Sequence, residues 1–334
     1  MMCDRSYRRA GWGSWWSVLV VAVLVLSGGG AWGGEPLRVV ATTGMIADAA
    51  REIGGPRARV EALMGEGVDP HLYKASPRDV RKMADAGLVL HNGLHLEGKM
   101  GEAIERMAGR TRVVRVTDSI DEGQLRRPPE FEGQYDPHVW FDVSLWGRVA
   151  ERVRDAMIEA DGSGRAEYEQ RAAAYVALLA ALDGHVRETI ATIPASQRLM
   201  VTAHDAFGYF GRAYGIEVRA IQGISTDSEA SLRDVNALVE VLVSRRVPAV
   251  FIESSVPRKT IDALVEGCRS RGHEVRVGGE LFSDAMGKSG TPEGTYVGMV
   301  VHNAEAIARA LGGLPPARPA LVEEYLSKHG AKAP

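Results

Sequence analysis

A long segment without proline, residues 163–193, separates two parts of the chain that show the same order of expected elements. Between Glu167 and Leu182 the segment is rich in alanine and has helical periodicity, which predicts one helix. About 30 residues at about 1.5 Å each would form a rod of roughly 45 Å, long enough to span a molecule of this size. We therefore expect a rigid helical link between two halves.

Short apolar runs that are typical of buried strands alternate with helical patterns on both sides of this link. One helix start is marked by Ser76-Pro77-Arg78-Asp79, with serine at the N-cap and proline at the first helical position. This alternation predicts an α/β fold of two domains with parallel sheets. The expected strands cover residues 37–42, 59–64, 88–92, 112–116, 198–202, 217–221, 249–253 and 274–277. The expected helices, besides the one from Ser76, cover residues 44–54, 99–108, 143–160, 206–214, 228–245, 258–271 and 295–311.

The N-terminal segment, residues 1–34, has the organisation of a secretory signal peptide. Arg5, Arg8 and Arg9 precede an apolar run from Trp15 to Leu26, and small residues follow. The run is shorter than the roughly 18–20 residues of a membrane-spanning helix; an uncleaved anchor and twin-arginine export are the alternatives. No cysteine lies near the end of the run, so we expect cleavage and export into a periplasm without a lipid anchor.

Composition and charge exclude some classes of partner. The formal net charge is −3, which gives no indication of a nucleic-acid or anionic-membrane partner. A hydrophobic content of 45% with 25% charged residues fits a folded protein with a full core. After loss of the signal peptide Cys268 is the single cysteine, so no internal disulfide can form. Its helix-like surroundings predict a buried, unreactive thiol.

Two copies of one short motif carry the first candidate metal ligands. Asp69-Pro70-His71-Leu72-Tyr73 and Asp136-Pro137-His138-Val139-Trp140 each place a histidine directly after Asp-Pro, far apart in the sequence. Proline restricts its own φ and favours an extended residue before it, so each histidine leaves a rigid turn. Imidazole is also the commonest protein ligand for transition metals. A single histidine in a loop is more often a packing or surface residue, but the repetition of the whole motif predicts that both histidines have the same role.

His204 and Asp284 complete the candidate set, because all four residues follow expected strands. In open α/β sheets ligands bind beyond the carboxyl ends of the strands, and facing halves would bring the four residues together in a cleft. His204 could instead cap the next helix together with Asp205, and Asp284 could be a turn residue beside Gly287. Three imidazoles and one carboxylate suit Zn²⁺, and also Mn²⁺ or Fe²⁺ with a bidentate carboxylate.

These residues resemble the metal-binding solute receptors of zinc and manganese ABC importers, the TroA/PsaA/ZnuA-like cluster A-I family. The resemblance covers essentially the whole chain after the signal peptide. Besides the two Asp-Pro-His motifs, its specific marks are Asn92-Gly93-Leu94-His95-Leu96-Glu97, Thr202-Ala203-His204-Asp205-Ala206-Phe207, Glu253-Ser254-Ser255-Val256-Pro257 and Gly294-Thr295-Tyr296.

The resemblance implies a site, a domain organisation and a cargo. The family's four metal-ligand positions match His71, His138, His204 and Asp284. Two (β/α)4 lobes joined by one long helix are implied, so we expect metal-binding lobes at residues 35–162 and 195–334, a linking helix at 163–194 and modest lobe motion. Many zinc-dedicated relatives carry a histidine-rich loop before the second ligand, whereas residues 119–135 contain no histidine. Mn²⁺, Zn²⁺ and Fe²⁺ therefore all stay open as the cargo.

The function implied by the resemblance is capture of Mn²⁺ or Zn²⁺ in the periplasm and delivery to an ABC permease in the inner membrane. The chain has no Walker A sequence, so the ATPase would be a separate chain, and we expect a monomer that is not an enzyme. The alternative is a secreted zinc-dependent hydrolase, which would keep three protein ligands and an open water position. A receptor for an organic solute would leave the histidine and aspartate set unexplained.

Other polar and aromatic residues are assigned lesser roles. Asp205 or Glu253 could orient a ligating histidine, and Trp140 with Phe141 should pack the floor of the cleft. The remaining histidines are expected at the cleft rim or at the surface. For His91 and His95 a surface or packing position is the first expectation, with a cleft-rim or ligand-orienting role as the alternative, and His185, His273, His302 and His329 are expected at the surface.

Overall fold

The first half of the chain is built on a four-stranded parallel sheet in the computed structural model, which describes residues 34–129, 131, 133–227 and 230–330. The strand order is β2-β1-β3-β4, and all three strand pairs are parallel. The central strands are apolar and buried on both faces, as parallel sheets covered by helices require. The strands are β1 (Leu37–Ala41), β2 (Ala58–Ala62), β3 (Leu88–His91) and β4 (Val113–Arg115).

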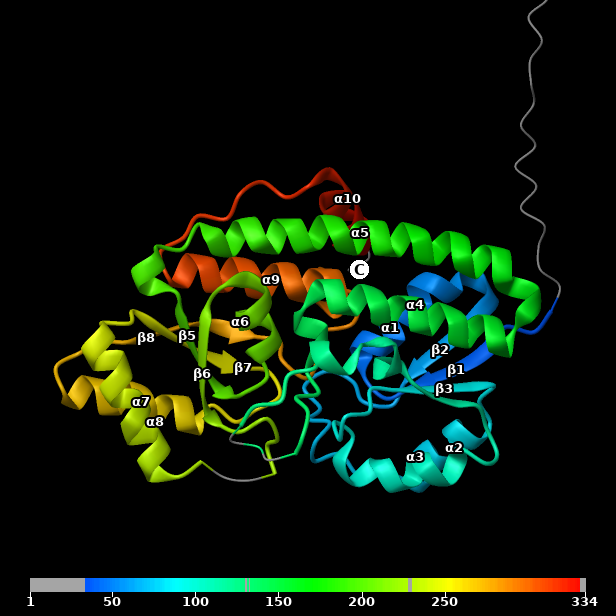
Figure 1. Cartoon of the computed structure of the whole chain (residues 1–334), viewed down its shortest axis with the longest axis horizontal. Helices are drawn as coiled ribbons and strands as arrows, with labels where there is room; N and C mark the ends of the chain where they lie inside the picture. The colour runs from blue at the N-terminus through cyan, green and yellow to red at the C-terminus, as the bar shows by residue number, and fades with distance from the viewer. Residues whose placement is uncertain (1–33, 130, 132, 228–229, 331–334) are drawn as a thin grey trace, which may run out of the picture. The chain divides into compact units, whose positions relative to one another are not determined.

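Two pairs of helices cover the faces of this sheet (Figure 1). One face packs against α1 (Gly44–Gly54) and α4 (Val143–Ala160) in the main hydrophobic core. The other face packs against α2 (Pro77–Ala84) and α3 (Gly101–Met107) in a smaller cluster. The predicted start of α2 is confirmed, because Ser76 and Asp79 form a reciprocal capping box.

The predicted long helix is confirmed as α5 (Arg165–Ala191), which has 27 residues and a length of about 40 Å. It extends over both halves, alongside α4 and α9 (Tyr296–Ala310) (Figure 1). Its buried residues, among them Tyr168, Leu182 and Val186, belong to the main core. The helix therefore joins the halves through packing along its length.

The second half contains two pairs of parallel strands. β5 (Leu199–His204) pairs with β6 (Glu217–Gln222), and β7 (Ala249–Glu253) pairs with β8 (Arg276–Leu281). β5 and β7 are neighbours, yet at their carboxyl ends the amides of Ala203 and His204 donate to Glu253 Oε1 at 2.8 and 2.9 Å. A side-chain carboxylate thus accepts hydrogen bonds that a backbone carbonyl would accept in a continuous sheet.

The helices of the second half also form two layers. α7 (Leu232–Arg245) and α8 (Lys259–Ser270) share a separate hydrophobic cluster with the strands. α6 (Gly208–Tyr214) and α9 contribute to the main core together with α1, α4 and α5. The main core is therefore continuous through both halves. Short 3-10 helices occur at Gly55–Arg57, Gly98–Met100, Val116–Ser119, Glu122–Gln124, Val139–Phe141, Gly162–Gly164, Ala195–Gln197 and Pro292–Gly294.

The structure departs from the sequence-based expectations in two places. A last helix, α10 (Ala320–Gly330), was not predicted; it packs against α5 and α9 through Val322 and Leu326. The prediction that His185 lies at the surface is wrong: it is 1% exposed, with its Nε2 3.5 Å from Glu305 Oε1 of α9. The packing of α9 along α5 buries this side of the long helix.

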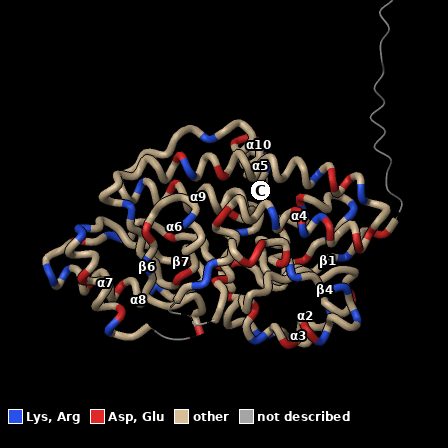
Figure 2. The backbone as a smooth tube through the Cα atoms, in the orientation of Figure 1, with Lys and Arg blue, Asp and Glu red and all other residues tan. Residues whose placement is uncertain are grey.

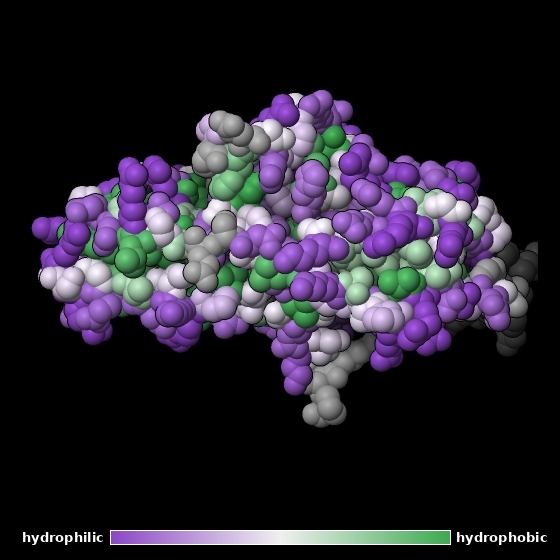
Figure 3. Space-filling view, turned by 90° about the horizontal axis from the view of Figure 1, so that it is seen from below, coloured by the Kyte–Doolittle hydropathy of each residue, from purple (hydrophilic) through white to green (hydrophobic). Residues whose placement is uncertain are grey.

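The structure also bears on the predictions for Cys268 and for the N-terminal segment. Cys268 is buried, as predicted. The signal-peptide prediction falls almost wholly outside the described residues. Among the residues that the structure describes, none of the helices combines the length and apolarity needed to cross a membrane. Lys, Arg, Asp and Glu are interspersed along the described elements (Figure 2), and the face shown in Figure 3 is largely hydrophilic with apolar residues between.

Tyr296→Phe tests the contact between α9 and the first half. Tyr296 Oη donates to the Trp140 carbonyl at 2.7 Å, and both groups are buried. Removing this hydroxyl should lower the free energy of unfolding by about 1 kcal/mol, because the carbonyl loses its partner. Equilibrium urea unfolding measures the change. The control Tyr135→Phe removes an exposed hydroxyl and should cost less than about 0.5 kcal/mol; equal losses would contradict the prediction.

Candidate metal centre

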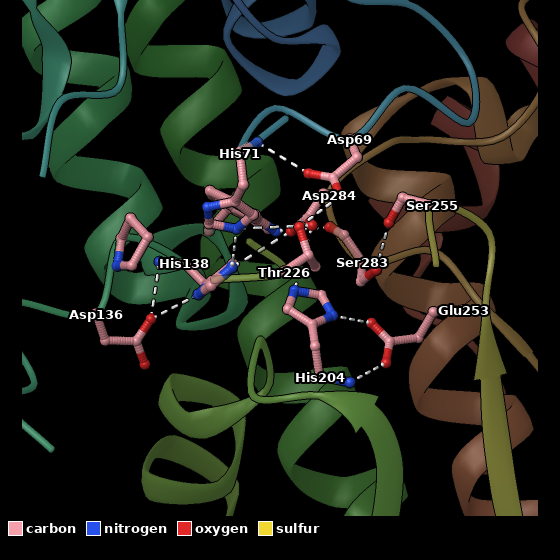
Figure 4. Close-up of polar contacts among 12 residues, drawn as sticks. Asp69, His71, Asp136, His138, His204, Thr226, Glu253, Ser255, Ser283 and Asp284 are labelled. Atoms are coloured by element: carbon pink, nitrogen blue, oxygen red, sulfur yellow. Dashed lines mark hydrogen bonds and ion pairs between the residues drawn. The ribbon is translucent and has the colours of Figure 1, made fainter. Parts of the chain in front are cut away.

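Four side chains that are distant in the sequence converge at one buried point between the halves. They are His71, His138, His204 and Asp284, and one donor atom from each lies within 4.8 Å of all the others (Figure 4). Each residue is at most 2% exposed. The structure therefore brings together the four residues predicted from the sequence, and it shields them from solvent.

Each residue lies at or after the carboxyl end of a strand. His71 follows β2, His138 follows β4, His204 is the last residue of β5, and Asp284 follows β8. Parallel strands place these ends at one edge of each sheet, and the two edges face the same point (Figure 4). The expectation about strand ends explains how both halves contribute to one site.

The spacing of the donor atoms fits a single small cation. His71 Nε2 lies 3.4 Å from His138 Nε2, and the Nε2 atoms of His138 and His204 lie 3.3 and 3.2 Å from the oxygens of Asp284. Zinc ligands at roughly 2.0–2.1 Å in a tetrahedron are about 3.3 Å apart. His71 Nε2 is slightly farther from Asp284 Oδ2, at 3.9 Å. Three of these four distances are close to the separation of ligands in four-coordinate zinc.

The Asp284 carboxylate is buried and its charge is compensated by the imidazoles of the cluster. Its oxygens lie 3.3 and 3.2 Å from the Nε2 atoms of His138 and His204, but without the alignment of a regular hydrogen bond, although a buried carboxylate normally has such bonds. Oδ1 faces His138, whereas Oδ2 faces His71 and His204. Both oxygens are thus directed to the centre of the cluster, where a cation could be held by one oxygen or by both.

The repeated Asp-Pro-His motif has a local structural explanation. Asp69 Oδ1 accepts the His71 amide at 2.8 Å, and Asp136 Oδ1 accepts the His138 amide at 3.0 Å. In both copies the aspartate side chain bonds to the backbone two residues on, as in an Asx turn. The proline between them restricts the same turn, so each histidine has a defined backbone before a metal arrives.

Two buried carboxylates orient the imidazoles of His138 and His204. Asp136 Oδ1 lies 2.7 Å from His138 Nδ1, and Glu253 Oε2 lies 2.6 Å from His204 Nδ1. Asp136 forms a hydrogen bond with Nδ1 of His138, whereas Glu253 lies beside Nδ1 of His204 as an ion-pair partner. Each carboxylate favours a proton on Nδ1, and Nε2 is directed to the centre. Glu253 was one of the predicted partners, but Asp205 makes no such contact with a described histidine. The role of Asp136 was not predicted. An aspartate occupies the same position in both copies of the motif, and this repetition could have indicated the role.

Charges around the site keep protons on two of the three imidazoles. Burial lowers the pKa of His138, but the carboxylates of Asp136 and Asp284 outweigh burial and raise this pKa to about 9. Burial likewise lowers the pKa of His204, but Glu253 and Asp284 raise it well above its usual value. Both rings are therefore protonated at neutral pH when no cation is bound.

His71 and Asp284, the other two members of the cluster, have pKa values below their usual ranges. Burial lowers the pKa of His71 to about 4, since the opposing effect of Asp284 is smaller. Burial raises the pKa of Asp284, but the charges of His204 and His138 hold it well below its usual range. Binding one divalent ion would release two protons, because ligating imidazoles must be neutral at the donor nitrogen. The exchange leaves the formal charge of the site unchanged.

Neighbouring side chains connect the site across the two halves. Asp69 Oδ2 accepts from Thr226 Oγ1 at 2.6 Å, so the turn of His71 is bonded to the second half. Trp140 packs edge-on against His138 with ring centroids 5.2 Å apart, and its Nε1 donates to the Ser283 carbonyl at 3.0 Å. These contacts support the prediction that Trp140 packs beside the site.

The remaining candidate histidines lie outside the cluster. His91 and His95 line a separate surface cavity of about 540 Å³, and His95 is exposed. His273, His302 and His329 are partly exposed. Among the described residues, a group of donors with metal-binding spacing occurs at the buried cluster alone.

Comparison with known proteins places this arrangement in context. A family model named ZnuA, described as the periplasmic component A of a zinc-uptake complex, matches residues 39–310. The chain is 50% identical over 278 residues to the zinc-binding protein TroA of Treponema pallidum (strain Nichols), covering 83% of this chain and 89% of the relative. It is 46% identical over 278 residues to the manganese-binding lipoprotein MntA of Bacillus subtilis (strain 168), covering 83% and 90%.

The fold is similar to that of a solved relative. The structure of the periplasmic zinc-binding protein TroA from Treponema pallidum matches with a TM-score of 0.81 at 49% sequence identity, covering 83% of this chain and 99% of that chain. The similarity confirms the predicted fold class, with parallel sheets and one long helix.

Metal binding should be steeply dependent on pH. Between about pH 6 and pH 8 two protons compete with the metal, so affinity should fall about tenfold per proton for each pH unit of acidification. Above pH 9 the dependence should weaken, because His138 then loses its proton without the metal. Calorimetric titration with Zn²⁺ in two buffers of different ionisation enthalpy measures the released protons. Release of fewer than one proton would contradict the assignment.

Glu253→Gln should weaken metal binding while preserving the fold. The amide oxygen can still accept the backbone amides of β5, but the charge that holds the His204 Nδ1 proton is lost. Loss of such a partner typically costs roughly 10- to 100-fold in metal affinity. Competition with a chelator measures the affinity. The control Glu280→Gln changes an exposed glutamate of β8 and should have no effect; a similar loss in both variants would refute the role of Glu253.

Proposed function

Because the chain belongs to the ZnuA family of periplasmic zinc-uptake components, we propose that it captures one divalent transition metal for an ABC importer. The single observation that supports this proposal most directly is the buried Asp284 carboxylate, whose oxygens face three imidazoles and form no aligned hydrogen bond with the described residues. Such a group is stable when a cation or protons occupy the centre. We propose His71, His138, His204 and Asp284 as the ligands.

A receptor accounts for the site better than an enzyme does. Catalytic zinc typically keeps three protein ligands and an open water position, whereas this cluster offers four protein side chains, all buried. The family consists of transport components. The alternative of a secreted zinc hydrolase loses support, because neither feature favours chemistry at the metal.

The cargo is either Zn²⁺ or Mn²⁺, with Fe²⁺ also compatible with the donor set. The relatives include one named for zinc and one named for manganese, so similarity does not select between them. A carboxylate that binds through one oxygen completes a four-coordinate zinc site, and one that binds through both gives the higher coordination that suits manganese. Nitrogen donors favour zinc over manganese in solution, so metal availability contributes to the choice.

Delivery requires partners in the membrane. The chain is the substrate-binding component of an ABC transporter, and we propose an inner-membrane permease with a separate ATPase as its partners, with the receptor acting as a monomer. The receptor is extracytoplasmic. We further propose that a signal peptide corresponding to residues 1–34 is cleaved and that no lipid anchor follows. We also propose that residues 35–162 and 195–334 form the two metal-binding lobes.

His71→Ala tests the proposed ligand set. Wild-type protein should bind one equivalent of Zn²⁺ or Mn²⁺, and the variant should lose on the order of 100-fold in affinity because one of four donors is gone. Titration of chelator-treated protein measures both values. The control His273→Ala removes a partly exposed histidine that lies outside the cluster and should bind like wild type. Equal affinity of His71→Ala and wild type would refute the proposed site.

The cargo is identified by a separate measurement. Metal analysis of protein purified from its native compartment, combined with growth under separate zinc and manganese starvation, distinguishes the two ions. Turnover of ester or amide substrates by the metal-loaded protein would instead support the hydrolase.

A further inference from the structure

A strained loop at the end of β3, residues 92–98, lies against the backbone of both first-half ligands. Leu94 and His95 adopt positive φ angles of 53° and 65°, and the neighbouring Gly93 and Gly98 have φ angles of 79° and 34°. Residues other than glycine rarely adopt such angles, and strained backbone persists when the surroundings hold it in place. The loop therefore requires a specific stabilising interaction.

The buried carboxylate of Glu97 supplies that interaction. Its Oε1 accepts from the Asn92 amide at 2.6 Å and from Thr42 Oγ1 at 2.8 Å. Its Oε2 accepts from the Gly93 amide at 3.0 Å. Glu97 is 3% exposed, so the three donors replace the water that a carboxylate would otherwise need. The side chain closes the loop on itself and connects it to the end of β1.

The loop holds the turn that carries His138. Asn92 Nδ2 donates to the Pro137 carbonyl at 3.0 Å, while Asp136 accepts the His138 amide. These two bonds hold both polar groups of the peptide unit between Pro137 and His138. Thr117 Oγ1 donates to the Asn92 carbonyl at 2.6 Å and holds Asn92 from the opposite side.

The other end of the loop contacts the backbone of His71. A Cβ added at Gly98 would lie 2.4 Å from the His71 carbonyl oxygen and 3.6 Å from its Cα. Only glycine permits this approach, so the loop backbone rests directly on the backbone of this ligand. One loop therefore contacts two ligands that are distant from each other in the sequence.

We propose that Glu97 is a positioning residue of the metal centre, which acts through the loop 92–98 to set the backbone of His71 and His138. The proposal rests on the proposed function, because it concerns the same site. Glu97 does not touch the metal. Its role is to hold two imidazoles at the 3.4 Å separation that one small cation needs.

Glu97→Gln tests this role with little change in shape. The amide nitrogen of glutamine is a donor, so it cannot replace the oxygen that accepts from a backbone amide. We expect metal affinity to fall roughly 10- to 100-fold, as for other supporting partners of metal ligands. We also expect the absorption spectrum of the Co²⁺-loaded protein to change, because the geometry of the ligands changes. Both are measured well below the unfolding temperature.

A matched control separates positioning from stability. Glu305→Gln removes another largely buried, ion-paired carboxylate, which contacts Arg309 and Arg318 far from the site. This variant should lower the unfolding temperature but keep the wild-type affinity and Co²⁺ spectrum. Should Glu97→Gln do the same, with affinity within about threefold of wild type, Glu97 would be merely structural and the proposal would be overturned.

A second variant and the wild-type titration complete the test. If Glu97→Gln does not fold, Asn92→Ala removes only the side chain that reaches the Pro137 carbonyl, and it should change the Co²⁺ spectrum and weaken binding. A wild-type spectrum and affinity in that variant would overturn the proposal. Failure of wild-type protein to bind Zn²⁺, Mn²⁺ or Co²⁺ would instead overturn the proposed function.

Discussion

The arrangement of this protein depends on one buried carboxylate that faces three imidazoles. Asp284 lies after the end of β8 with both oxygens directed to the centre of the cluster and hidden from solvent. An isolated charge in that position is costly, so the surrounding structure has to provide positive charge. Without a metal, the protonated rings of His138 and His204 provide it; with a metal, the ion does. Both halves are needed in either state, which explains why the site lies between them.

The side chains that hold the ligating histidines in position come both from the same turn and from segments distant in the sequence. Each Asp-Pro-His turn defines the backbone of its own histidine, whereas Glu253 serves a ligand on a neighbouring strand and interrupts the bonding between β5 and β7. Glu97 is likewise a buried carboxylate, although it bonds to the amides of Asn92 and Gly93 and to the Thr42 hydroxyl and contacts no imidazole of the cluster. Four acidic side chains outside the ligand set, Asp69, Asp136, Glu253 and Glu97, thus support the positions of the imidazoles. A site built in this way tolerates changes at the surface better than changes in these supports.

Much of the fold and the cluster could be predicted from residue patterns, because those patterns are local. Proline next to histidine, apolar runs of strand length and a long segment without proline each report on their own neighbourhood. The burial of His185 could not be predicted, since it depends on α9 packing along the other side of α5. The same holds for α10, because its packing partners α5 and α9 are distant in the sequence. The supporting role of Asp136 was predictable in principle, because the Asx turn and the pairing with Nδ1 both lie within one motif.

The continuity of the main core affects the resistance of the protein to proteolysis. Residues of α1, α4, α5 and α9 bury one another in a single cluster, so neither half can open far without exposing apolar surface of the other. An ion held between the halves therefore raises the free energy of opening for the whole chain by mass action. Proteases cleave the opened form of a protein. We therefore expect the metal-loaded receptor to resist degradation better than the empty one, so that scarcity of the metal would shorten the lifetime of the protein that collects it.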